Sequence, residues 1–111
     1  MAALTGSDRR HLRGLANPLK PIVQIGEAGL TDNVLGAADS ALRDHELIKI
    51  RMLAADRGQR RELAARIAVA TGSELAGVIG HVAIFYRAAE DAERRQIRLP
   101  SAGGGRADLR G

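Results

Sequence analysis

The sequence predicts a single α/β domain with the element order α-β-α-β-α-β-β, in which three helices pack on one four-stranded mixed sheet. Segments whose apolar residues recur at helical spacing alternate with short β-branched runs, so helices can connect the early strands as crossovers. The last two β-prone runs are separated by only two residues, which favours an antiparallel pair. A length of 111 residues suits one domain with one modest core.

The first helix is expected over residues 6–16. Thr5 followed by Asp8 is typical of a helix N-cap, and apolar residues recur at helical spacing until Pro18, which cannot continue the helix. The other face of this helix carries a short basic stripe, formed by Arg9, Arg10 and Arg13. The stripe is either a solvated helix face or part of a binding surface.

The first strand and the second helix are joined by a turn between two glycines. The apolar run Pro21–Ile25 is rich in β-branched residues and predicts a buried strand. The turn Gly26-Glu27-Ala28-Gly29 follows this run directly. Thr31 is a good N-cap for the next helix, whose apolar stripe ends near His45. The local order is therefore strand, glycine-bracketed turn and helix.

The second strand and the third helix come next along the chain. The run Glu46–Leu53 alternates, so that Lys49 and Arg51 lie side by side on the face opposite its isoleucines. A capping-box-like pattern begins the third helix, which we expect over residues 57–71. Gly72 stands where a left-handed C-terminal cap is expected.

The last two strands form a predicted hairpin. The runs Glu74–Ile79 and Val82–Arg87 are separated by Gly80-His81, and glycine in the first loop position suits a type II′ turn. The composition then becomes polar, and residues 101–111 contain too few apolar side chains to remain ordered. The sequence therefore predicts a domain over residues 1–100 and a disordered tail that contains glycine and arginine.

The composition excludes several classes of protein. The chain has no cysteine, which excludes a disulfide framework and a thiolate zinc site and makes a reducing cytoplasm the expected location. No apolar run approaches the roughly 20 residues that cross a bilayer, so we expect a soluble, unexported protein without a membrane partner. A net charge of +4 and a pI of 10.6 suggest a polyanionic partner. Phe85 and Tyr86 are the only aromatic residues, which disfavours folds that stack bases on several rings.

The sequence offers no recognisable catalytic or metal site. Its three histidines, His11, His45 and His81, are far apart in the chain, and no serine has a base at a recognisable spacing. The glycine-bracketed turn has neither the spacing of a P-loop nor that of the dinucleotide fingerprint. We therefore expect a protein that is not an enzyme and that needs no cofactor and no metal.

The turn between the two glycines is the strongest candidate binding site. Glycine at both ends lets a ligand approach the backbone N–H groups without a Cβ in the way. These amides and the positive end of the following helix favour a phosphate, whereas Glu27 opposes one. Further cations must come from neighbouring elements, and the pattern places four of them nearby, namely Lys20, Arg13, Lys49 and Arg51. A plain tight turn is the alternative interpretation.

Several segments occur together in an order that is specific for one family. They are His11–Pro21, Gly26–Thr31, His45–Ile50, Val78–Gly80 and Phe85–Arg87. The matches run in order over residues 5–99, and this part of the chain resembles the CRM (YhbY-like) RNA-binding family, of the bacterial single-domain type.

The resemblance implies a fold similar to the C-terminal domain of translation initiation factor three, with a GxxG loop that contacts RNA much as a KH-domain loop does. Free-standing bacterial members of the family are associated with precursors of the large ribosomal subunit, and plant organellar relatives assist group II intron splicing. The chain differs from many members at two positions. Glu27 replaces a lysine or a small polar residue within the turn, and His81 replaces a lysine after Gly80.

The leading hypothesis is a monomeric RNA-binding protein that acts in assembly of the large ribosomal subunit and contacts ribosomal RNA through the turn and the four cations. With about three to five phosphate contacts, the logarithm of its affinity should fall with the logarithm of salt concentration at a slope of roughly −2 to −4. The alternatives are a protein-interaction module that docks on an acidic partner, an RNA-binding factor for splicing or regulation, and a phosphate-binding enzyme.

Overall fold

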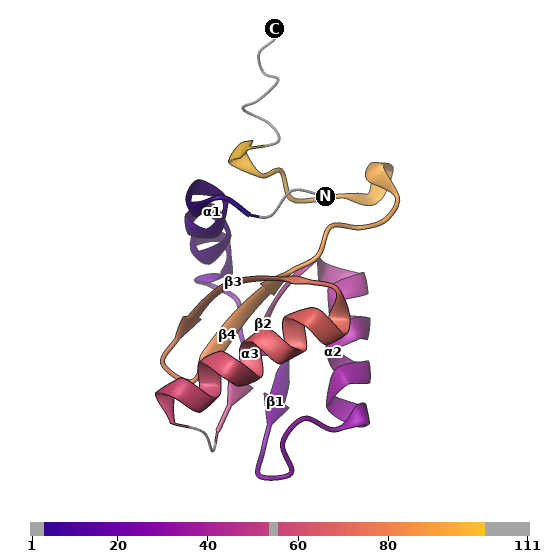
Figure 1. The fold of residues 1–111 in the computed structure, drawn as a ribbon. Helices are drawn as coiled ribbons and strands as arrows, with labels where there is room; N and C mark the ends of the chain where they lie inside the picture. Colours follow the sequence, from indigo (N-terminus) through magenta and orange to yellow (C-terminus); the bar gives the residue numbers. More distant parts are fainter. Residues whose placement is uncertain (1–3, 54–55, 102–111) are drawn as a thin grey trace, which may run out of the picture.

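Three helices and four strands follow one another in the predicted order, so the expected fold class is confirmed. The computed structural model describes residues 4–53 and 56–101. Within them the elements are α1 (Gly6–Ala16), β1 (Val23–Ile25), α2 (Asp32–His45), β2 (Leu47–Met52), α3 (Arg57–Thr71), β3 (Glu74–Ile79), β4 (Val82–Tyr86) and a 3-10 helix, η1 (Ala92–Arg94). The strands form one mixed sheet in the order β1-β2-β4-β3 (Figure 1). β1 and β2 are parallel, and the other neighbouring pairs are antiparallel.

The helices begin and end where the sequence places capping residues. The Thr5 hydroxyl accepts a hydrogen bond from the Asp8 N–H at 3.0 Å, and the Asp8 carboxylate accepts one from the Thr5 N–H at 3.1 Å. Asp56 and Gln59 form the same reciprocal capping box at the start of α3. α3 ends at Gly72, whose φ of 66° is left-handed. These local signals explain why the predicted bounds of α1 and α3 are confirmed.

The strands are shorter than predicted at several ends. β1 begins at Val23 instead of Pro21, because proline has no N–H to donate to a strand ladder. β2 does not include Glu46, whose φ of 64° ends α2 and is incompatible with an extended strand. β2 ends at Met52 and β4 at Tyr86, one residue earlier than predicted in each case.

The β3–β4 hairpin has the predicted turn and one irregularity. Gly80 has a positive φ of 60° and His81 does not have a positive φ, which matches a type II′ turn and excludes type I′. The pairing register shifts between Leu75 and Gly77, so that β3 contains one additional residue, Ala76. An insertion of this kind interrupts the strand ladder locally.

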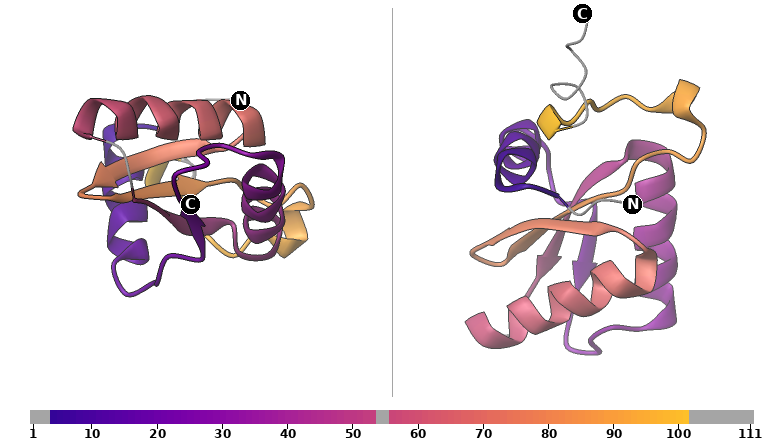
Figure 2. Two further views of the ribbon diagram at one scale, coloured as in Figure 1. Left: turned by 90° about the horizontal axis from the view of Figure 1, so that it is seen from below. Right: turned by 45° about the horizontal axis from the view of Figure 1, so that its top comes forward.

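Helices cover both faces of the sheet. α2 and α3 lie over one face and α1 over the other, as the views in Figure 2 show, and we call these the α3 face and the α1 face. Phe85 is fully buried on the α3 face. Tyr86 is buried on the α1 face at 6% exposure. Two cores, one on each side of the sheet, therefore stabilise the domain, instead of the single core that its length suggested.

A buried carboxylate holds the C-terminal segment, residues 88–101, against the domain. Glu46 is 3% exposed, and its side chain lies at the junction of α2 and β2. It accepts hydrogen bonds of 2.8 to 3.1 Å from the backbone N–H groups of Ala89, Gln96 and Ile97. These charge-assisted bonds satisfy a carboxylate that would otherwise be costly to bury.

A second buried carboxylate fixes the end of this segment. Asp8 accepts hydrogen bonds from the backbone N–H of Ser101 at 2.9 Å and from its hydroxyl at 2.6 Å. Ser101, which the sequence assigned to the disordered tail, is therefore bound to the first turn of α1. The remainder of the predicted tail, residues 102–111, lies outside the described residues.

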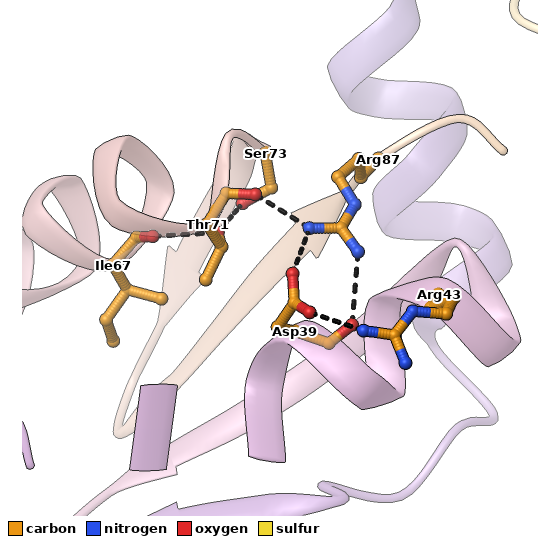
Figure 3. Close-up of polar contacts among 6 residues, drawn as sticks. All are labelled: Asp39, Arg43, Ile67, Thr71, Ser73 and Arg87. Atoms are coloured by element: carbon orange, nitrogen blue, oxygen red, sulfur yellow. Dashed lines mark hydrogen bonds and ion pairs between the residues drawn. The ribbon is translucent and has the colours of Figure 1, made fainter. Parts of the chain in front are cut away.

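An arginine network joins the end of β4 to α2 and α3 (Figure 3). Arg87 donates hydrogen bonds to the Asp39 carboxylate and to the Thr71 carbonyl, both at 2.7 Å. Arg43 forms a second ion pair with Asp39, also at 2.7 Å. The hydrogen bond and charge of Arg87, together with Arg43, lower the pKa of Asp39 even though desolvation acts in the opposite direction. Arg87, part of one segment that resembles the family, is thus a structural residue.

Candidate functional site

The GxxG turn lies on the surface at the end of β1. Gly26, Glu27 and Ala28 are exposed, and Gly29 has a φ of 77°, which only glycine adopts readily. The Gly29 N–H donates a hydrogen bond of 3.1 Å to the Gly26 carbonyl and is therefore used within the turn. The amides of Gly26, Glu27 and Ala28 have no acceptor in the part of the chain that the structure describes. Three of the four amides thus remain open to a ligand.

The two glycines differ in what the fold requires of them. Gly29 needs its positive φ, so a side chain there would be strained. Gly26 has no positive φ, and a Cβ built on it meets no atom within 4 Å. The packing of the protein itself therefore does not require glycine at position 26. A close approach by another molecule would explain it.

The topology brings three connections to the same end of the sheet. Because β1 and β2 are parallel, the GxxG turn and the exit from β2 lie together, and the Leu53 N–H donates to the Ile25 carbonyl at 3.1 Å. Because β4 runs antiparallel to β2, the β3–β4 turn reaches this end too, where the Met52 N–H donates to the His81 carbonyl at 2.7 Å. We call this part of the molecule the turn end, at the bottom of Figure 1.

Lys20 and Arg51 lie beside β1, with Lys20 three residues before the strand and Arg51 opposite Gln24 on β2. They line the same groove, with a volume of about 370 Å³, and both residues are exposed. Gln24 lines this groove too and pairs in register with Arg51. Neither cation forms an ion pair within residues 4–53 and 56–101. We call this the cationic groove, and it is lined by Lys20, Pro21, Ile22, Val23, Gln24 and Arg51.

Arg13 does not join this groove, which corrects the sequence prediction. Its guanidinium donates a hydrogen bond of 3.1 Å to the Ala76 carbonyl, at the irregularity in β3. Its Cδ lies 2.9 Å from the position that a Cβ on Gly77 would occupy, so the side chain lies flat against that glycine. Arg13 is partly buried between α1 and the sheet and serves the packing of the α1 face.

Lys49 lies on the same face of β2 as Arg51, but its ammonium group has protein partners. It donates hydrogen bonds to the Asn17 carbonyl at 3.3 Å and to the Leu19 carbonyl at 3.0 Å. These carbonyls belong to the chain leaving α1, so Lys49 fixes the segment that carries Lys20. The bonds are exposed to solvent, and Lys49 still adds positive charge beside the groove.

The start of α2 contributes less to the turn than the sequence suggested. The Thr31 hydroxyl accepts a hydrogen bond from the Val34 N–H at 3.2 Å and so caps the helix from within the chain. Asp32 places a negative charge in the first turn, where it interacts favourably with the helix dipole. The positive end of α2 is therefore partly compensated, and the open amides of the turn carry more of any anion binding.

Comparison with known proteins shows to which family the chain belongs. Residues 4–87 match the model of the CRS1/YhbY (CRM) domain. The chain belongs to this family. The CRM domain of this chain is 37% identical over 100 residues to a Haemophilus influenzae protein named RNA-binding protein, a match that covers 90% of this chain and 98% of the relative. It is 35% identical over 97 residues to Bacillus subtilis YqeI, named a probable RNA-binding protein, covering 87% and 99% respectively.

A solved structure supports the fold assignment of this CRM domain. The solution structure of a hypothetical protein from Staphylococcus aureus superposes on it with a TM-score of 0.78 and 39% sequence identity. The match covers 87% of this chain and 99% of that chain. The architecture described above is therefore shared with that protein.

The sequence interpretation missed a group of arginines at the start of α3. Arg57, Arg60 and Arg61 occupy its first turn and a half, and this first turn contains no acidic residue. Cations at this end oppose the helix dipole and lower helix stability. Arg57 and Arg61 are exposed, whereas Arg60 is partly buried and has a contact within the protein. The sequence signal that could have revealed this group is the three arginines that closely follow the Asp56 cap.

The structure places the start of α3 near the turn end, because β2 leads into α3 there (Figure 1). Arg57 and Arg61 therefore add positive charge on the α3 face of the sheet, while Lys20 and Arg51 add it beside β1. The described residues contain no group of three or more His, Asp and Glu side chains that could hold a metal ion. No helix among them is long and apolar enough to span a bilayer.

Proposed function

We propose that this CRM domain binds RNA at its turn end, with a phosphate held by the open amides of Gly26, Glu27 and Ala28 and with Lys20 and Arg51 on the adjoining backbone. The observations that carry the proposal are the unpartnered amides of the turn that follows β1 and a groove along β1 with two exposed cations that have no ion-pair partner among the described residues. The names of the Haemophilus and Bacillus relatives support RNA as the polyanion.

The binding mechanism follows from the groups available. Backbone amides and basic side chains contact phosphates, which fix the position of an RNA without reading its sequence. Both aromatic rings are buried, so the domain cannot stack bases on them. Affinity is therefore dominated by the RNA backbone. Arg57 and Arg61 extend the same interface to the α3 face, so that the RNA crosses the end of the sheet.

We further propose that the RNA is ribosomal and that the protein acts as a monomer in the cytoplasm during assembly of the large ribosomal subunit, without catalysing a reaction. The support is the resemblance to free-standing bacterial members of the family. Crosslinking in cells, followed by sequencing of the attached RNA and mapping of the attached peptides, tests this role. Large-subunit precursor RNA attached to peptides of the turn end is the expected result, and recovery of messenger or intronic RNA instead would contradict it.

A salt titration tests the binding mechanism. For a single-stranded ribosomal RNA fragment, the Lys20→Gln/Arg51→Gln variant should reduce the slope of log affinity against log salt by about 1.4, because each neutralised phosphate contributes about 0.7 to that slope. Arg9→Gln/Arg10→Gln is a matched control, because these exposed arginines lie on α1 and the charge change is identical. Equal slopes for the two variants, or a slope near zero for the unmodified protein, would refute the mechanism.

A substitution in the turn separates RNA binding from a protein-interaction role. Gly26→Asp introduces a negative charge where a side chain has open space and no positive φ, so the fold should be retained. RNA binding should fall strongly, because the carboxylate repels the phosphate. An unchanged RNA affinity, with an unchanged melting temperature, would favour a turn without a role in RNA binding.

A further inference from the structure

A second groove adjoins the cationic groove and differs from it in chemistry. Its volume is about 390 Å³, and the two grooves share Lys20 and Ile22. Leu15, Leu19 and Ile22 line it and are 41%, 40% and 49% exposed. We call it the apolar groove, and its lining is Leu15, Leu19, Lys20, Ile22, His45, Leu47, Ile48, Gln96 and Ile97.

Exposed apolar side chains are concentrated in this groove. Six large hydrophobic residues within the described part of the chain are strongly exposed, and three of them line it. The other three are Leu53 directly after β2, Val69 on α3 and Ile79 at the end of β3. Isolated exposed apolar residues are normal on a protein surface, but a cluster beside a charged groove indicates a binding surface.

The outer wall of the apolar groove is held in place by the fold. Gln96 and Ile97 belong to the C-terminal segment, and their backbone N–H groups donate to the Glu46 carboxylate at 2.8 and 3.1 Å. The segment that carries Leu19 is fixed by Lys49, whose ammonium group donates a hydrogen bond to the Leu19 carbonyl at 3.0 Å. The groove therefore exists before any ligand arrives, which reduces the entropic cost of binding.

The shared lysine indicates what occupies the groove. A wholly apolar partner would bury Lys20 without an anion, which is unfavourable. A nucleotide has an apolar base joined to an anionic phosphate, and this combination matches an apolar groove with a cation at its border. His45 and Gln96 also line the groove and supply polar groups for the edge of a base.

We propose that the apolar groove receives one base of a single-stranded RNA whose adjacent phosphate lies in the cationic groove at Lys20 and Arg51. This inference rests on the proposed RNA binding and adds a base subsite to it. Leu15, Leu19 and Ile22 provide the aliphatic contact that aromatic rings provide in other single-strand binders. A base inside a duplex is stacked between its neighbours and cannot enter, so the subsite makes the domain prefer unpaired RNA.

The experiment is a cycle with two proteins and two RNAs. The proteins are the full chain and its Leu19→Ala/Ile22→Ala variant, and the RNAs are a short single-stranded oligonucleotide and the same oligonucleotide without bases. The full chain should bind the intact RNA about tenfold more tightly than the abasic one, a ratio that corresponds to a typical base contact. The variant should bind both RNAs almost equally, and its salt slope should remain that of the full chain.

Controls separate this inference from unfolding and from a general failure to bind RNA. Val69→Ala changes an apolar residue that is 84% exposed on α3, and it should leave the tenfold ratio intact. If the double variant has a lowered melting temperature, Leu15→Ala replaces it, because Leu15 lines the same groove from α1. If the full chain shows the expected salt slope, but the full chain and the groove variants have the same ratio of affinities for intact and abasic RNA, the base subsite alone is overturned. A flat slope with no RNA binding would overturn the proposed function, and the subsite with it.

Discussion

The four cations that the sequence placed around the GxxG turn divide into two pairs in the structure. Lys20 and Arg51 are exposed and line one groove along β1. Arg13 and Lys49 instead satisfy backbone carbonyls of β3 and of the segment after α1. Alternation predicts the face of a strand on which a side chain lies, but not which carbonyl lies within its reach.

At the residue scale, Glu27 should weaken RNA binding by its charge. Glu27→Gln removes an exposed carboxylate next to the open amides, so we expect affinity to rise roughly 1.4- to fivefold, since exposed charge pairs contribute about 0.2 to 1 kcal/mol. The gain should shrink at high salt. Glu93→Gln in η1 makes the same change of charge elsewhere and should have no such effect, and a decrease in affinity with Glu27→Gln would show that the carboxylate contributes to binding.

Asp8 should make the stability of the domain depend on acid. Burial would raise the pKa of Asp8, but the hydrogen bonds from Ser101 and Thr5 outweigh it and lower the pKa from 3.8 to about 2. The folded state therefore binds fewer protons than the unfolded state between these values, so stability decreases as the pH falls from about 4 to about 2.

The test of this dependence is a series of melting temperatures against pH. Asp8→Ala should cost about 1 to 2 kcal/mol at neutral pH, because it removes the capping box and releases Ser101. Its melting temperature should then fall less steeply than that of the unmodified protein below a pH of about 4. Asp44→Ala alters an exposed carboxylate on α2 and serves as the control. Parallel profiles for the Asp8 variant and the unmodified protein would contradict the assignment.

At the scale of elements, helix bounds were predictable and strand ends were not. Thr5, Asp56 and Gly72 act through residues close to them in the chain, so their effects can be inferred from the sequence alone. The end of a strand depends on its partner, as in the register shift that directs the Ala76 carbonyl toward Arg13. An isolated glycine in β3, Gly77, was the only local indication of that irregularity.

The start of α3 gives a prediction in which stability and binding change in opposite directions. Arg57→Gln/Arg61→Gln should lower affinity for single-stranded RNA and reduce the magnitude of the salt slope by about 1.4, if both contact phosphate. The melting temperature should stay the same or rise, because these cations oppose the helix dipole. Arg66→Gln, exposed further along the same helix, is the control. Unchanged binding with a raised melting temperature would limit the interface to the α1 face and the turn.

At the scale of the whole molecule, element order predicted the fold class, but not how the chain is held together. The mixed sheet follows from two helical crossovers and one hairpin. The roles of Glu46 and Asp8 depend on the C-terminal segment, whose polar composition gave no sign that it would pack against α1. A carboxylate that binds a backbone amide far along the chain leaves no recognisable spacing in the sequence. The sequence analysis therefore missed these roles of Glu46 and Asp8.

The bond between Asp8 and Ser101 has a consequence for how this domain can be combined with others. It brings the two ends of the described chain together at the first turn of α1, on the side of the molecule away from the GxxG turn (Figure 1). Polypeptide fused before residue 4 or after residue 101 would leave from that side. Copies of the fold could therefore be joined in tandem, or attached to a solid support by either terminus, with the GxxG turn unobstructed.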